Sequence, residues 1–135
     1  MNNKLWAVLA LALLAGNANA GSVVVAANSN VGPMDAEAVR RVFLGRESSL
    51  GGAPVHVIYQ KDGAVRSEFD KSVLGRSGAE LTTYWSRLIF TGKAKAPAER
   101  NGDAAVKAEV AGTRGAIGYI SDASVDATVK VLYDY

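Results

Sequence analysis

The residues best suited to chemistry lie where an apolar segment gives way to a polar one: Gln60, Asp62, Gly63, Arg66 and Ser67. The Arg66 guanidinium is permanently charged and pairs with oxyanions, and the Ser67 hydroxyl can donate a hydrogen bond. Glycine at position 63 relaxes the backbone at this point. Together these groups indicate a site for a small oxyanion. The alternative is a solvated surface arginine that pairs with a nearby carboxylate such as that of Asp62.

Two elements must position these groups. β-Branched and aromatic residues predict a buried strand over Val55–Tyr59, followed by a turn at Lys61–Gly63 and then a helix. We expect the carboxylate of Asp62 to cap that helix. A strand that ends at a helix N-terminus presents unpaired N–H groups and a partial positive charge, which is a common geometry for holding an anion.

Other residues with chemical potential have simpler explanations. His56 is the single histidine, and its apolar neighbours favour a core or sheet-face position over a ligand role. No metal site is expected at His56, because nothing in the sequence places carboxylates that would converge on this histidine. Tyr84 and Trp85 have helix spacing that favours core packing over ligand stacking. Lys93 and Lys95 are expected in a solvated loop.

Enzyme signatures are missing from the sequence. Gly92-Lys93 lacks the earlier glycine, at Arg87, and the following hydroxyl, at Ala94, that a P-loop requires. There is no G-x-S-x-G motif. With one histidine and no cysteine, pairs of nucleophile and base are scarce. We therefore expect neither an enzyme nor a cofactor.

The N-terminal residues are typical of a secretory signal peptide. Lys4 precedes an apolar run over Leu5–Ala15, and Ala18–Ala20 is a small-residue cleavage pattern. We expect a signal peptide over residues 1–20 and one domain over residues 21–135. The apolar run is shorter than the roughly 20 residues of a membrane span, although a retained anchor is the alternative. The prediction is a periplasmic protein with no membrane insertion after cleavage.

The overall composition limits the partners. A formal charge of +2 argues against nucleic acid as a partner, since binding to a phosphate backbone needs a basic face. The sequence contains no block of like charges and no basic amphipathic helix of the kind that favours a membrane surface. The absence of cysteine excludes a disulfide framework and a lipid-modified cysteine anchor.

Four apolar strands and four helices alternate along the chain. The pattern predicts an α/β fold with an about four-stranded, mainly parallel sheet flanked by about four helices. Expected strands are at 22–27, 55–59, 115–120 and 129–133, and expected helices follow Asp35, Gly63, Ser77 and either Asn101 or Asp103. Residues 91–100 are predicted to be a polar loop.

Three stretches together resemble one family. They are Val42-Phe43-Leu44-Gly45, Lys61-Asp62-Gly63 after a strand, and Gly115-Ala116-Ile117-Gly118-Tyr119. Their order and spacing resemble the type 2 periplasmic substrate-binding proteins of ABC transporters, in particular the phosphate-binding group. Full members have two lobes that close on a ligand. This chain is long enough for one, so the resemblance implies a short single-lobe member that matches the second lobe.

The resemblance is incomplete at the junction. Phosphate-binding members have Arg-x-Asp-Gly-Ser-Gly-Thr there, whereas residues 60–66 of this chain read Gln-Lys-Asp-Gly-Ala-Val-Arg. Asp62 and Gly63 match, but the arginine and both hydroxyls are replaced. Arg66 and Ser67 are placed to compensate, because first-turn side chains reach the mouth of a helix.

The resemblance implies an exported solute-binding module with phosphate or a similar oxyanion as ligand. Weak binding by the monomer is expected, because one lobe leaves the anion facing water. An ABC transporter permease or a homodimer is the expected protein partner. Arg66→Ala is expected to abolish binding and leave the fold intact. The alternative is a periplasmic accessory module that kept the fold and lost the ligand.

Overall fold

The structure, a computed structural model, describes residues 20–135. The predicted signal peptide therefore lies outside the described residues, apart from Ala20. The strands are β1 (Gly21–Ala26), β2 (Ser49–Leu50), β3 (Ala53–Pro54), β4 (His56–Gln60), β5 (Ala98–Arg100), β6 (Ala116–Ser121) and β7 (Val129–Asp134). The helices are α2 (Ala36–Phe43), α3 (Ala64–Phe69), α4 (Gly78–Phe90) and α5 (Asp103–Gly112). A π-helical turn η1 (Asp70–Leu74) continues α3, and a 3₁₀ turn η2 (Asp122–Ser124) follows β6.

The main sheet is mixed, with the strand order β5-β4-β6-β1-β7. Strand β4 pairs in parallel with β5 and β6, whereas β1 pairs antiparallel with β6 and β7. The predicted α/β class and the four helices are confirmed. The sheet differs from the expectation in having five strands and two antiparallel pairings. The fifth strand, β5, lies in the segment that was predicted to be a loop.

Each face of the sheet carries its own hydrophobic core because side chains alternate between faces along a strand. In β1, Val24 packs with α5, whereas Val23 and Val25 pack on the opposite face. In β4, Ile58 faces α5 and Tyr59 faces the other side. Within the described residues 20–135, both cores are built from residues that follow Gly21.

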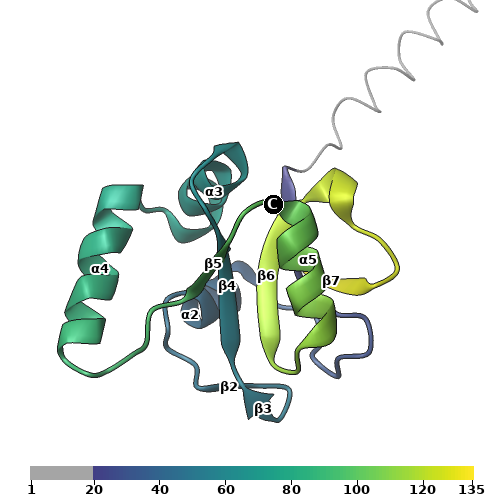
Figure 1. Cartoon of the computed structure of the whole chain (residues 1–135), viewed down its shortest axis with the longest axis horizontal. Coiled ribbons are helices and arrows are strands. Elements are labelled where there is room, and N and C mark those ends of the chain that lie inside the picture. Colours follow the sequence, from purple (N-terminus) through teal and green to yellow (C-terminus); the bar gives the residue numbers. More distant parts are fainter. Residues whose placement is uncertain (1–19) are drawn as a thin grey trace, which may run out of the picture.

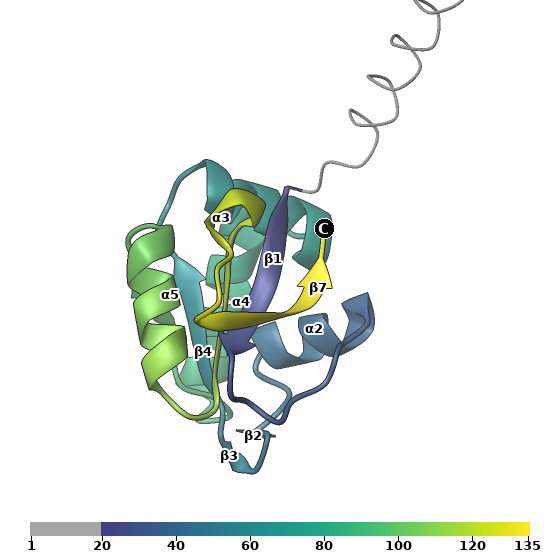
Figure 2. The same ribbon diagram turned by 90° about the vertical axis from the view of Figure 1, so that its right-hand side faces the viewer.

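The helices form two outer layers of unequal size. Helix α5 lies alone on one face, and α2 lies on the other (Figures 1 and 2). The larger core beneath α2, α3 and α4 is rich in aromatic rings. Phe69 and Tyr119 stack with ring centroids 3.8 Å apart, and Phe43 meets Phe69 edge-on at 4.9 Å. Burying a ring of this size contributes roughly 1.5–3 kcal/mol, so this cluster anchors α3 to the sheet.

The predicted helix starts at Asp35 and Ser77 are confirmed. The Asp35 carboxylate accepts a hydrogen bond from the Ala38 N–H at 2.8 Å. Ser77 and Glu80 form a reciprocal capping box at the start of α4. Among the described residues, no helix is both long and apolar enough to cross a membrane.

Candidate functional site

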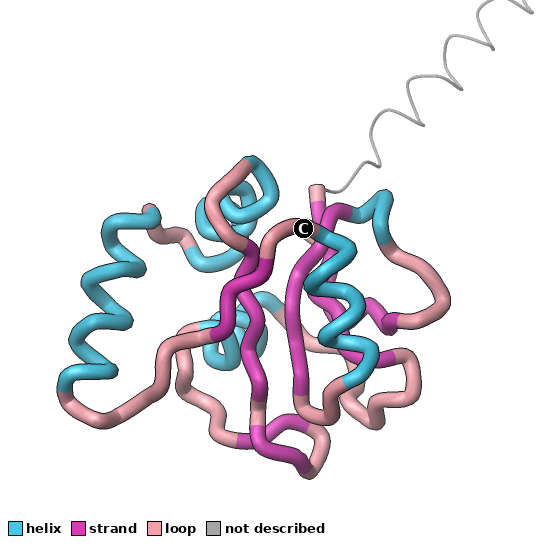
Figure 3. The backbone as a smooth tube through the Cα atoms, viewed as in Figure 1, coloured by secondary structure: helices cyan, strands magenta, loops and turns pink. Residues whose placement is uncertain are grey.

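The junction between β4 and α3 has the expected order of elements. Strand β4 ends at Gln60 and α3 begins at Ala64 (Figure 3). Gly63 occupies the N-cap position with φ at 151°, a backbone conformation that favours glycine, and no side chain caps the helix. The predicted cap by Asp62 is therefore wrong, because the helix begins one residue later than that cap requires.

An open pocket of about 780 Å³ lies beside this junction, between α3 with η1 and the N-terminal end of α4. Three of the predicted site residues line it: Asp62, Arg66 and Ser67. The other side chains with chemical potential in its wall are Asp70, Lys71, Arg76, Ser77, Thr82 and Glu99. The structure thus brings residues from α3, η1, α4 and β5 to one cavity.

Arg66 is the most strongly held side chain of this pocket. Its Nε lies 3.0 and 3.2 Å from the two carboxylate oxygens of Asp70. Its Nη1 donates to the backbone oxygen of Gln60 at 2.9 Å and to Glu99 at 3.1 Å. The guanidinium also lies 4.8 Å from the centroid of the Tyr59 ring. Within the described residues, Nη2 has no hydrogen-bond partner, so it is the donor that remains for a ligand.

Burial and charge act against each other at Asp70. Burial raises the pKa of its carboxyl, and the neighbouring Arg66 guanidinium opposes that rise without cancelling it. Because only 5% of Asp70 is exposed, its charge depends on Arg66. The ion pair therefore fixes the direction of the arginine towards the helix.

The pocket is close to electrically balanced. Asp62, Asp70 and Glu99 face the same cavity as Arg66, Lys71 and Arg76. The N-terminal end of α4 adds a partial positive charge, since Ser77 and Gly78 line the wall. The pocket can accommodate an anion, but its own carboxylates reduce the attraction.

Gln60 and Gly63 do not line the pocket. Gln60 is only 4% exposed, and its side-chain Nε2 donates to Asp103 at 2.6 Å and to the backbone oxygen of Tyr119 at 3.0 Å. Its backbone N–H donates to the Tyr119 hydroxyl at 3.0 Å. In this structure Gln60 joins β4 to β6 and α5, and Gly63 serves as the N-cap of α3.

The sequence analysis missed Asp103 as a polar anchor. Its carboxylate accepts hydrogen bonds from the side chain of Gln60, from the Ser121 N–H and from the Ser124 hydroxyl. Burial alone would raise the pKa of Asp103, but these hydrogen bonds hold it below the usual value. Its position in the first turn of α5 was readable, but its three donors come from distant segments.

His56 takes part in a separate polar cluster. Its Nε2 lies 2.6 Å from the Glu109 carboxylate, which also accepts from Arg100 Nε at 2.5 Å. The hydrogen bond from His56, together with Arg100, lowers the pKa of Glu109. Among the described residues, no three histidine, aspartate or glutamate side chains gather in a way that would hold a metal ion.

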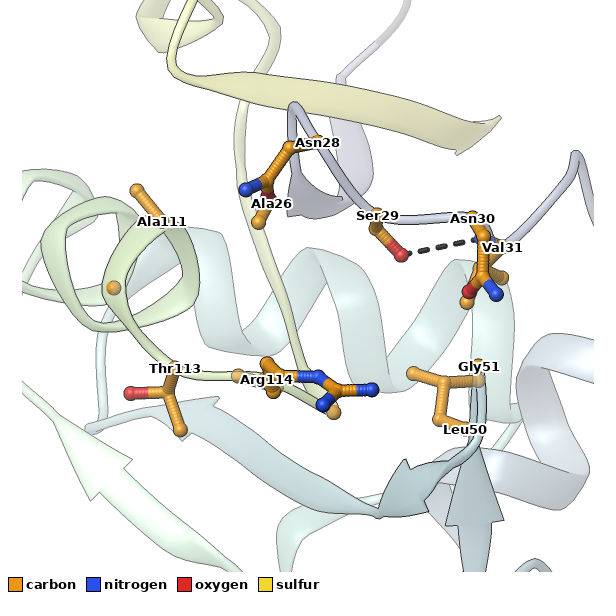
Figure 4. A pocket seen from close by; sticks show the side chains of 13 residues that line it. Ala26, Asn28, Ser29, Asn30, Val31, Leu50, Gly51, Ala111, Thr113 and Arg114 are labelled. Atoms are coloured by element: carbon orange, nitrogen blue, oxygen red, sulfur yellow. Dashed lines mark hydrogen bonds between the residues drawn. The ribbon is translucent and has the colours of Figure 1, made fainter.

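A second pocket of about 370 Å³ lies near the start of β6, at the opposite end of the sheet from the close of β4. Figure 4 shows Arg114 reaching across it towards Leu50 and Gly51, with Asn30 beside them. The Ser29 hydroxyl there accepts a hydrogen bond from the Val31 N–H. None of the predicted site residues lines this pocket.

Comparison with solved structures found matches that include phosphate-transport proteins. The chain is similar, with a TM-score of 0.65 and 25% identity, to a protein from Clostridium perfringens assigned as a phosphate ABC transporter substrate-binding protein, with bound phosphate. It is similar to an ABC-type phosphate transport receptor from Vibrio cholerae, with a TM-score of 0.56 and 18% identity. It is also similar to PstS from Borrelia burgdorferi, with a TM-score of 0.63 and 13% identity.

The extent of these matches defines what the chain corresponds to. Each match covers 84% of this chain but only 44%, 45% and 46% of the respective structures. The chain thus spans less than half the length of these proteins, which corresponds to one lobe, and the predicted resemblance is confirmed at the level of structure. No protein-family model matches the sequence, and no curated protein matches it.

Proposed function

We propose that residues 21–135 form an exported, single-lobe solute-binding module that holds a small oxyanion such as phosphate in the pocket between α3 and α4. One observation carries the proposal. Asp62, Arg66 and Ser67, selected from sequence, line one open pocket with the N-terminal end of α4. The likeness to one lobe of receptors for phosphate, one of which holds phosphate, supports the same ligand class. The module has no catalytic role in this proposal.

Binding by the monomer is weak. A two-lobed receptor with micromolar affinity has about −8 kcal/mol of binding free energy, and half of that corresponds to a millimolar dissociation constant. Asp70 and Glu99 already neutralise Arg66, which weakens the site further. We expect a dissociation constant for phosphate weaker than about 0.1 mM. Tighter binding requires a second copy of this lobe or a transporter permease to close over the pocket.

Glu99 provides the sharpest test. Its side chain is 53% exposed and engages Arg66 Nη1 at 3.1 Å, so Glu99→Gln removes a negative charge beside the proposed anion without opening the core. Coulomb interaction at this range predicts a gain in phosphate affinity of about three- to tenfold. Glu37→Gln is the matched control, because it removes the same charge from an exposed carboxylate on α2.

The measurement is phosphate titration by calorimetry and phosphorus NMR on residues 21–135, with the solution mass verified. Weak binding that tightens in Glu99→Gln and not in Glu37→Gln supports the proposal. Micromolar affinity in a verified monomer contradicts the expected weakness. Absence of any response up to about 10 mM phosphate in both the unmodified chain and Glu99→Gln rejects the oxyanion site.

A non-enzymatic accessory module is the second candidate. The observation that favours it is the engagement of Arg66 by two carboxylates, which leaves the pocket without excess positive charge. This candidate predicts no ligand response in the titrations, together with a stable protein complex in a periplasmic pull-down.

A further inference from the structure

The C-terminal end of α4 carries the most exposed apolar side chains in the described part of the chain. Phe90 is 93% exposed and Ile89 is 45% exposed, and no other large hydrophobic residue among those described is exposed. The two are adjacent, at the point where α4 passes into the loop towards β5. Leu81 and Trp85, on the preceding turns, are buried. We call residues 87–95 the α4 tip.

The charged side chains within the α4 tip all have one sign. From Leu81 to Ala98 the chain contains Arg87, Lys93 and Lys95 and no carboxylate. All three cations are exposed, and among the described residues none takes part in an ion pair. A further pocket, of about 640 Å³, is lined by Lys93 and Lys95 of the tip, and the one acidic residue in its wall is Glu47, which pairs with Arg41. The tip therefore presents two exposed apolar side chains together with three exposed cations that form no ion pair in the described part of the chain.

We propose that the α4 tip is a contact site for an anionic phospholipid bilayer surface, with the Phe90 and Ile89 side chains entering the headgroup region and the three cations meeting lipid phosphates. Apolar side chains flanked by lysine and arginine are the combination that binds such interfaces. This contact is peripheral and requires no spanning segment.

Charge and area favour a membrane over a second copy of the chain. Two tips facing each other would bring Arg87, Lys93 and Lys95 of both copies together, and like charges in contact oppose association. A stable protein interface buries about 800 Å² on each partner, and two exposed apolar side chains supply little of that. A bilayer requires only that a few side chains enter it.

The position of the tip leaves the candidate site open. Helix α4 stands at one edge of the molecule, with its first turn beside α3 and its last turn at the far end (Figure 1). Ser77 and Gly78, at its start, line the proposed anion pocket, whereas the tip lies a full helix length away, about 20 Å. A chain seated by the tip would keep that pocket facing solvent.

The experiment measures partitioning of residues 21–135, which contain both cores, onto vesicles of phosphatidylglycerol and phosphatidylcholine. Vesicles of phosphatidylcholine alone serve as the neutral reference. Lys93→Gln/Lys95→Gln is expected to reduce partitioning to the anionic vesicles about 25-fold, since each basic side chain near such a surface contributes about fivefold. Phe90→Ser is expected to reduce it about tenfold through lost apolar burial.

The matched control is Lys61→Gln/Arg114→Gln, which removes two exposed cations away from the tip. Loss of binding in the tip variants with little change in the control supports the proposal, as does release at about 0.5 M salt. Equal partitioning of tip and control variants overturns it, and so does equal binding to neutral vesicles. A dimer that Phe90→Ser dissociates, without any vesicle binding, also overturns it and assigns the tip to contacts between copies.

Discussion

The guanidinium of Arg66 and the carboxylate of Asp70 lie one helical turn apart and face each other across the end of α3, with Nε 3.0 and 3.2 Å from the two carboxylate oxygens. The side chain of Asp70 is 7% exposed and that of Arg66 is 15% exposed, so this pair is shielded from solvent. Arg66 therefore has a structural task besides any contact with a ligand. It compensates a buried negative charge and ties α3 to the backbone of β4.

Arg66→Ala is expected to destabilise the protein by about 3 kcal/mol, because removing one partner of a buried ion pair leaves the other charge uncompensated. The sequence-based expectation that this variant leaves the fold intact does not account for Asp70. Urea denaturation measures the cost. The double variant Arg66→Ala/Asp70→Asn should lose less than the sum of the two single changes. Additive losses would show that the two residues are not coupled.

Local patterns predicted much of this fold because the information lies within a few residues. Ser77 and Glu80 form their capping box within a single turn, and Asp35 caps α2 in the same way. The spacing of Val39, Val42 and Phe43 marked the face that is buried. Each of these predictions depends on neighbours in sequence.

Pairings between distant segments escaped prediction. Strand β5 is short and polar, and it forms because its backbone pairs with Ile58, Tyr59 and Gln60 of β4. The apolar run in β1 indicates burial on both faces but carries no information on strand direction. The candidate site likewise combines local features, which could be predicted, with contacts between distant segments, which could not. Arg66 and Ser67 were readable as neighbours of a turn, whereas Glu99 reaches Arg66 from 33 residues away.

Tyr119→Phe tests the link between β6 and the end of β4. The Tyr119 hydroxyl accepts the backbone N–H of Gln60 at 3.0 Å, and removing it leaves that buried donor unpaired. The expected cost is about 1–3 kcal/mol in the free energy of unfolding. Tyr133→Phe is the control, since Tyr133 is partly buried and its hydroxyl makes no hydrogen bond in the described residues, and a change within about 0.5 kcal/mol is expected. Equal costs in both variants would contradict this role of the hydroxyl.

Gly118 sets the distance between β6 and α5. A Cβ atom at this position would lie 2.7 Å from Val106 Cγ1 and 3.2 Å from Val110 Cγ2. Gly118→Ala is therefore expected to cost about 1–3 kcal/mol through overpacking. Gly112→Ala, at the end of α5, is the matched control because nothing lies within 4 Å of its added Cβ, and it is expected to be neutral or stabilising. Thermal unfolding compares the two, and an unaffected Gly118→Ala would show that α5 can shift freely.

The carboxylate of Asp103 is expected to make stability depend on pH in the acid range. Hydrogen bonds from Gln60, Ser121 and Ser124 hold its folded-state pKa below the usual value despite partial burial. A lowered pKa means that the stabilisation is fully present above the unfolded-state value of about 3.9 and is lost as the pH falls through the folded-state value. Asp103→Asn should cost on the order of 2 kcal/mol at pH 7, because an amide oxygen replaces a charged acceptor.

Other carboxylates also titrate below pH 4, so the diagnostic quantity is the difference in unfolding free energy between the original chain and Asp103→Asn. That difference, measured by urea denaturation, should be constant from about pH 7 to 5 and should shrink below about pH 4. A difference that stays constant down to about pH 2.5 would show that the charge of Asp103 does not stabilise the fold.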